Sequence, residues 1–220
     1  MRNNAHISID DLTFALQRLS KHDYASIYED RLFRYLRWMH RMFGLKVTLY
    51  VYARMGEWAL DAMPDKYKAE FEGAKEWLKF GFHAVSEEQK RDNIIPEFAA
   101  AYKDTEKNIK RFAGVSSIAK IVRLHYWFYP KEYLDVLMRH EVKTVLVKEG
   151  KDAAYPKSWS TTLQIEKNSM TDIIKRIRHY NDEQPMVVFT HEWALNRKNK
   201  IKLAMALMMI RMRGYSYICE

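Results

Sequence analysis

The sequence predicts an α/β protein in which mostly parallel strands alternate with helices. A strand, a helix and a second strand follow one another between residues 5 and 52, and the same alternation recurs to the end of the chain. Strands that alternate with helices of this length pair in parallel through right-handed crossovers. The fold is therefore either a barrel or an open doubly wound sheet, and both bind ligands at the carboxyl ends of their strands.

The first strand and helix carry the clearest local signals. Residues 5–10 are β-branched at Ile7 and Ile9, and this strand ends at Asp10 and Asp11. Ser26 and Glu29 form a capping box for a helix that ends near Gly44, and a β-branched and aromatic strand follows at 45–52. Further strands are expected at 77–83, 121–124, 142–147, 162–166, 186–191 and 215–218, and helices at 66–74, 101–115, 130–140, 169–180 and before Gly214.

Length and composition predict one globular domain over residues 1–220. A chain of 220 residues with 48% hydrophobic residues has ample material for one core. It has no apolar stretch long enough for a membrane span and no apolar centre of a signal peptide near its start, so we expect a cytoplasmic protein. The oligomeric state is left open. Cys219 is the single cysteine, so any metal site must use histidine and carboxylate ligands.

The formal charge of +9 indicates either attraction to a polyanion or a solvated basic surface. Six basic residues and no acidic residue lie between Ala194 and Gly214, but Leu203 to Ile210 is wholly apolar. We interpret this segment as a buried helix with basic ends, and we do not expect nucleic acid as a partner. The sequence has no glycine-rich phosphate loop, so no nucleotide cofactor is expected either.

The predicted strand ends bring ionisable residues to one rim. Asp10 and Asp11 either cap a following helix or, because adjacent carboxylates repel one another, bind a cation or an arginine. His83 is either a core histidine or a metal ligand. Glu87, four residues later, reaches the same ion if the chain turns; otherwise it is a first-turn helix acid.

The later strand ends add a cation and several rings. Arg123 follows an apolar pair and needs an anionic partner, for which Asp10 is the candidate. His191 is either a structural group or a proton donor, and Trp193 offers a flat face to a sugar or packs at the rim. The segment after Arg123 extends the rim or covers the barrel end with three rings: His125, Tyr126 and Trp127.

These ordered motifs resemble the polysaccharide deacetylase, or NodB-homology, superfamily of metal-dependent carbohydrate de-N-acetylases. The likeness spans most of the chain: Ile7-Ser-Ile-Asp-Asp11, Gly81-Phe-His-Ala84, Arg123, Phe189-Thr-His191 and Arg213-Gly-Tyr-Ser-Tyr-Ile218. Several positions depart from the family pattern, since Glu87 stands where a second metal-binding histidine is expected and Leu124 follows Arg123 in place of proline. The usual late Asp-x-x-Asp-Trp segment is also missing.

The resemblance implies an irregular, incomplete β/α barrel that hydrolyses acetyl groups from an N- or O-acetylated carbohydrate. It implies Asp11 and His83, with Glu87 or water, as ligands of a divalent metal, with zinc expected first and cobalt, nickel or manganese as alternatives. Asp10 is the implied base, Arg123 orients it, and His191 is the implied acid, with Glu192 as its candidate partner. The alternatives are a non-catalytic carbohydrate-binding or regulatory relative, and a basic module that binds polyanions.

Overall fold

A mainly parallel sheet around one central strand forms the larger wall of the protein. The computed structural model describes residues 3–89, 94–150, 153–181 and 183–220. The strand order is β3-β2-β1-β9-β8, with β10 beside β1 and β4 beside β2. The seven strands are β1 (Asn4–Leu12), β2 (Val47–Met55), β3 (Trp58–Ala59), β4 (Leu78–Ser86), β8 (Leu163–Gln164), β9 (Met186–His191) and β10 (Ser216–Ile218). Only the β2–β3 pair is antiparallel among the described pairs.

A second, three-stranded parallel sheet forms the opposite wall: β5 (Ile121–Val122), β6 (Thr144–Val147) and β7 (Ser158–Ser160). One bridge between Phe80 and Ile118 joins it to β4. At the other edge, the Gln184 side chain accepts the backbone N–H of Ser160 at 2.8 Å and donates to its carbonyl at 3.0 Å. These side-chain contacts at the end of β7 take the place of backbone hydrogen bonds to a further strand. The two sheets therefore form an incomplete barrel, as the family resemblance implies.

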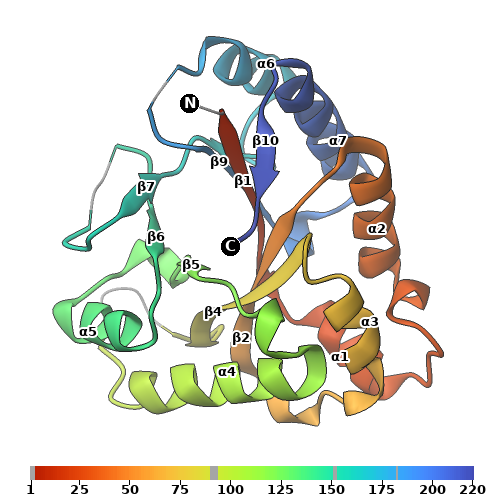
Figure 1. Ribbon diagram of the computed structural model, residues 1–220, viewed down its shortest axis with the longest axis vertical. Helices are drawn as coiled ribbons and strands as arrows, with labels where there is room; N and C mark the ends of the chain where they lie inside the picture. The colour runs from red at the N-terminus through yellow and green to blue at the C-terminus, as the bar shows by residue number, and fades with distance from the viewer. Residues whose placement is uncertain (1–2, 90–93, 151–152, 182) are drawn as a thin grey trace.

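Helices lie around the outside of these strands (Figure 1). They are α1 (Phe14–Lys21), α2 (Arg31–Phe43), α3 (Lys68–Gly73), α4 (Phe98–Ala113), α5 (Lys131–Arg139), α6 (Met170–His179) and α7 (Arg197–Met212). In the described part of the chain, none of them is long and apolar enough to cross a membrane. The amphipathic helices bury one face against the sheets, which leaves the barrel interior to the strands.

The predicted helix ends are mostly confirmed. Gly44 takes the left-handed conformation (φ 70°) at the end of α2, and Ser169 forms a capping box with Asp172 at the start of α6. Ser26 instead caps a short 3-10 turn, and α2 begins after Asp30, whose Oδ1 accepts the Leu32 N–H at 2.8 Å. The helix therefore starts later than predicted, because the aspartate competes for the same free amides.

An apolar layer fills the barrel below the carboxyl ends of the strands. It consists of Tyr50, Ile121, Leu146, Trp159 and Val187. Gly81 is required beside it, because a Cβ there would lie 2.8 Å from the Tyr50 ring. His6 of β1 lies against Tyr50 and Trp159, with ring centroids 6.4 Å from each. This layer closes the floor beneath the ionisable residues.

Candidate metal centre and active site

Strand bulges turn Asp10, Asp11 and His83 toward the open end of the barrel. Between Ile9 and Leu12, β1 has one residue more than the part of β2 that pairs with it. Asp11, in this bulge, has a left-handed backbone (φ 56°). In the pairing of β2 with β4, His83 is likewise the extra residue, because its neighbours Phe82 and Ala84 pair with consecutive residues of β2. Side chains of a regular strand alternate between faces, whereas a bulge re-aims them. Both adjacent carboxylates can therefore contact residues of one site.

The interpretation of Asp10 and Asp11 as a helix cap is wrong. Neither carboxylate caps α1; the first amides of that helix, those of Thr13, Phe14 and Ala15, donate to Glu192 at 2.8 to 2.9 Å. Glu192 is committed to this contact and is not the partner of His191. Burial nevertheless raises the pKa of Glu192 to about 7, against the opposing effect of these amides and of Arg18.

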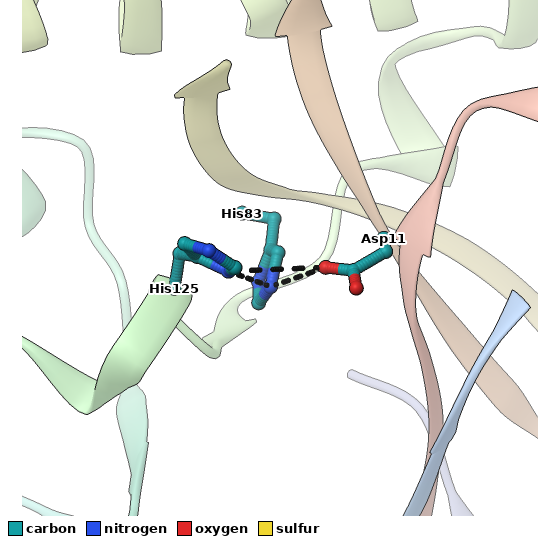
Figure 2. Close-up of side chains that lie close together, drawn as sticks. All are labelled: Asp11, His83 and His125. Carbon is teal, nitrogen blue, oxygen red and sulfur yellow. Dashed lines mark hydrogen bonds and ion pairs between the residues drawn. The ribbon is translucent and has the colours of Figure 1, made fainter. Parts of the chain in front are cut away.

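Asp11, His83 and His125 form a compact group of potential ligands (Figure 2). Asp11 Oδ1 lies 3.2 Å from His83 Nε2 and 3.8 Å from His125 Nδ1, and the two ring nitrogens are 3.3 Å apart. The ligand atoms all lie within 4.8 Å of one another. One aspartate and two histidines are an ordinary donor set for a borderline divalent metal.

The protonation of His83 favours a cation at this point. Its Nδ1 lies 2.7 Å from the Arg123 carbonyl oxygen, which can only accept, so Nδ1 carries the proton. A neutral His83 then presents the Nε2 lone pair to the Asp11 oxygen. Two electron-rich atoms at this distance require a metal ion or a second proton, and a histidine fixed through its other nitrogen is a common arrangement of metal ligands. The residues therefore fit a divalent ion.

The charges of the group agree with this fit. Burial raises the pKa of Asp11, but the hydrogen bond and charge of His83 in the form that carries the second proton, together with the Tyr52 hydroxyl at 2.6 Å, lower it by more, so Asp11 is ionised. Burial and the neighbouring His83 lower the pKa of His125 to about 4. At neutral pH, His125 is an uncharged imidazole, which is the form that binds metals.

Glu87 lies outside this group, and His125 is the third member instead. Strand β4 continues to Ser86, so the turn that would bring Glu87 back to His83 is not formed. Glu87 is exposed in the turn that follows the strand, and it is not among the residues whose ligand atoms lie together. His125 comes from a 3-10 turn after β5, in which Tyr126 and Trp127 both have positive φ, 57° and 54°.

Asp10 and Arg123 form a buried ion pair behind the group. Arg123 is 1% exposed, and its Nε lies 3.2 Å from Asp10 Oδ2 without the alignment of a hydrogen bond. Ser8 donates to the other Asp10 oxygen at 3.0 Å, and Arg123 Nη1 donates to Thr161 at 3.0 Å. The guanidinium lies over the Phe189 ring at 4.1 Å. Asp10 is thus held by charge and by packing, as the sequence predicts for this pair.

His191 is paired with Glu166, a residue that the sequence interpretation did not select. Its Nδ1 lies 2.5 Å from Glu166 Oε1, and its Nε2 lies 3.9 Å from Asp11 Oδ2. Burial lowers the pKa of His191, but Glu166 and the charges of Asp10 and Asp11 raise it by more. The signal was present in the sequence, because Glu166 ends the predicted strand 162–166 and the other strand ends were treated as site positions.

Aromatic rings surround the open end. Trp193 is 62% exposed, stacks on His191 with centroids 5.1 Å apart, and donates from Nε1 to Asp11 Oδ2 at 2.9 Å. Tyr126 is 46% exposed beside His125. Trp127 is half-buried with its ring edge toward Phe189. The predicted rim residues therefore gather here, with Tyr126 and Trp193 the more accessible faces.

Comparison with known proteins gives a structural likeness only. No protein-family model and no curated protein matches the sequence. The structure is similar over 98% of this chain to the Bc1960 peptidoglycan N-acetylglucosamine deacetylase (TM-score 0.62, 12% identity, 85% of that chain). It is also similar, again over 98% of this chain, to a family 4 acetyl xylan esterase from Clostridium thermocellum in complex with a cobalt ion (TM-score 0.58, 13% identity, 87% of that chain).

The fold is that of the family 4 carbohydrate esterases, the polysaccharide deacetylases. At these identities the likeness establishes the fold, which is the one that the sequence resemblance implies. This fold also occurs in BA3943, described as a family 4 pseudoenzyme, with TM-score 0.57 and 9% identity over 98% of this chain and 65% of that one. The fold alone therefore does not establish an activity, which depends on the residues of the site.

Proposed function

We propose that this protein is a metal-dependent hydrolase that removes acetyl groups from an N- or O-acetylated carbohydrate. The observation that carries the proposal is the group formed by Asp11, His83 and His125, in which His83 Nε2 lies 3.2 Å from a carboxylate oxygen and 3.3 Å from His125 Nδ1. Such a group gains from a divalent ion, and the fold supplies a floor and an aromatic rim around it.

The ligands of the ion would be Asp11 Oδ1, His83 Nε2 and His125 Nδ1. Zinc is the first candidate, because it favours imidazole and carboxylate ligands; cobalt, nickel and manganese are the alternatives. When bound, such an ion supplies Lewis acidity toward the acetyl carbonyl and lowers the pKa of water.

The remaining residues supply the two proton transfers that hydrolysis needs. Asp10, paired with Arg123, accepts the proton of the attacking water as the water oxygen bonds to the acetyl carbon. His191, whose pKa is raised by Glu166, donates a proton to the departing nitrogen or oxygen as the bond to the acetyl carbon breaks. The products are acetic acid and the free amine or hydroxyl, and the proton taken up by Asp10 returns through solvent to His191, so atoms and charge balance.

The rim residues would bind the sugar. Tyr126 and Trp193 present exposed rings on either side of the group, and aromatic faces stack well on the apolar face of a sugar ring. Trp127 supports the rim from its half-buried position. We assign His125 to the metal rather than to the substrate.

A non-catalytic carbohydrate-binding relative is the second candidate. It is favoured by one observation: both oxygens of Asp11 already accept hydrogen bonds, from Tyr52 at 2.6 Å and from Trp193 at 2.9 Å. A carboxylate satisfied in this way gains less from an ion. A family 4 pseudoenzyme with the same fold provides a precedent.

Metal analysis and acetate release separate the two candidates. Purified protein, stripped and then incubated with each of the four ions, is assayed for bound metal and for acetate released from a panel of acetylated oligosaccharides. The proposal expects about one ion per chain, ion-dependent acetate release, and loss of both in His83→Ala. A protein that binds the oligosaccharides but takes up no ion and releases no acetate would be the non-catalytic relative.

A further inference from the structure

A groove of ≈ 480 Å³ opens beside the candidate active site. This volume lies in the range of roughly 300–1,000 Å³ that is usual for ligand sites. The walls come from the starts of α1 and α2 and from the segment that joins β9 to α7. Trp193 links the groove to the site, because it lines the groove while its Nε1 contacts Asp11.

The groove has an excess of positive charge. Three cations line it, Arg18, Arg31 and Lys200, against one carboxylate, Glu192. Glu192 is occupied by the first amides of α1, and Arg18 pairs with Asp30 at 2.6 Å and approaches Glu192 at 3.7 Å. Arg31 and Lys200 form no ion pair with any residue that the structure describes. Two charges therefore remain without an anionic partner.

These cations are held near one another by the fold. Burial lowers the pKa of Lys200, and the charges of Arg31 and Arg18 lower it further, while Asp30 raises it. Lys200 Nζ also lies 5.1 Å from the centre of the Tyr35 ring, which fixes it over α2. The positive charges of these side chains repel one another, and a bound anion would relieve that repulsion.

The same groove offers apolar faces for a sugar. Phe14 is 38% exposed and Trp193 is 62% exposed, and both line it. Ring faces combined with unpaired cations suit a sugar that carries a negative charge, whereas a neutral glycan would leave the cations unpaired.

We infer that this groove binds a carboxylate, sulfate or phosphate group on the sugar next to the acetylated one. The inference rests on the proposed function and specifies its substrate class, an acidic acetylated glycan. It also gives Lys200 a role that the sequence interpretation did not, since that residue belongs to the segment interpreted as the basic end of a buried helix.

The test measures oligosaccharide binding by calorimetry on metal-free protein at low salt. A hyaluronan tetrasaccharide supplies carboxylates, a chondroitin sulfate tetrasaccharide supplies sulfates, and inorganic phosphate serves as a competitor. Chitotetraose is the neutral N-acetylated control. At least one acidic probe should bind about tenfold more tightly than chitotetraose, with an affinity that falls as salt rises. Chitotetraose binding as tightly as every acidic probe, with no effect of phosphate, would overturn the inference.

A pair of charge-matched double variants assigns the binding to the groove. Arg31→Gln with Lys200→Gln removes the unpaired cations, and Arg34→Gln with Lys198→Gln removes two exposed charges on the same helices outside it. The first variant should lose about tenfold in affinity for the acidic probe and keep its affinity for chitotetraose, while the second should resemble the unmodified protein. Equal losses in both variants, or none in the first, would contradict the inference.

Acetate release distinguishes a failure of the groove from a failure of the proposed function. If an acidic probe binds in a way that depends on Arg31 and Lys200 but no acetylated glycan releases acetate, the proposed function fails and the groove assignment stands. If acetylated neutral and acidic glycans are hydrolysed with equal kcat/KM, in the groove variant as in the unmodified protein, the groove assignment fails and the proposed function stands.

Discussion

The two ends of the barrel interior both contain buried histidine, but their neighbours differ. At the carboxyl ends of the strands, His83, His125 and His191 each lie within 4 Å of a carboxylate oxygen. In the apolar layer, His6 is fully buried beside Tyr50 and Trp159 and pairs with no described carboxylate. A nearby carboxylate is what lets a buried imidazole share a proton or a cation. The same residue type is thus structural in one layer and a functional candidate in the other.

The largest expected effect is at the carboxyl end. Asp10→Asn keeps the shape of the side chain but removes its capacity to accept a proton, so acetate release should fall on the order of 10³-fold. Thermal unfolding should still be cooperative, because Ser8 can still donate to the retained oxygen. Steady-state kinetics on a hydrolysed glycan measure the effect, and a fall of less than threefold would remove Asp10 from the role of base.

Arg123 pairs with Asp10 at the carboxyl ends of the strands, and its charge also acts on His6 in the apolar layer. Its loss should therefore affect stability as well as activity. Arg123→Ala leaves Asp10 as an unpaired buried charge, which should lower the free energy of unfolding by about 3–5 kcal/mol. Urea denaturation measures this. Adding Asp10→Asn to Arg123→Ala should recover part of the loss, and a double variant less stable than Arg123→Ala would argue against the ion pair.

His6 should control stability against acid. Burial, together with the charge of Arg123, lowers the pKa of His6 from 6.5 to about 3. The unfolded chain therefore binds a proton before the folded chain does, so this contribution is fully present above pH 6.5 and is lost as the pH falls toward 3. Between pH 6.5 and 4.5 the loss should be about 2–3 kcal/mol.

The non-titrating variant His6→Asn isolates that contribution from the other groups that titrate in acid. Urea denaturation of both proteins at several pH values should give a shallower fall for the variant. Parallel curves would show that His6 is not protonated on unfolding in this range.

The smallest of these effects should come from Glu166. In Glu166→Gln the pKa of His191 falls, so the protonated fraction at neutral pH falls and acetate release drops about tenfold. Activity that needs protonated His191 declines as pH rises through its pKa, and this decline should move to lower pH in the variant. An unchanged pH profile would mean that Glu166 does not act through His191.

The sequence predicted features that depend on neighbours along the chain. The end of α2 at Gly44, the start of α6 after Ser169 and the polar end of β1 all follow from local preferences. Of the long-range contacts, the Asp10–Arg123 pair was expected because a buried arginine needs an anion. The single-domain organisation and the cytoplasmic location stay predictions.

Features set by distant segments were missed. The short strand β7 has only three residues and is held partly by the Gln184 side chain. Glu87 was favoured because it is close to His83 in sequence, but the extended end of β4 carries it away. His125 reaches the group from a 3-10 turn in which the next two residues adopt positive φ, and the sequence does not reveal this conformation.

We propose that His125, and not Glu87, completes the metal centre with Asp11 and His83. Zinc titration by calorimetry of the unmodified protein, His125→Ala and Glu87→Ala tests it directly, and both substitutions truncate a side chain to the same residue. We predict that Glu87→Ala binds zinc as the unmodified protein does and that His125→Ala binds at least about tenfold more weakly. Weakened binding in Glu87→Ala together with unchanged binding in His125→Ala would show that Glu87, and not His125, is the third ligand.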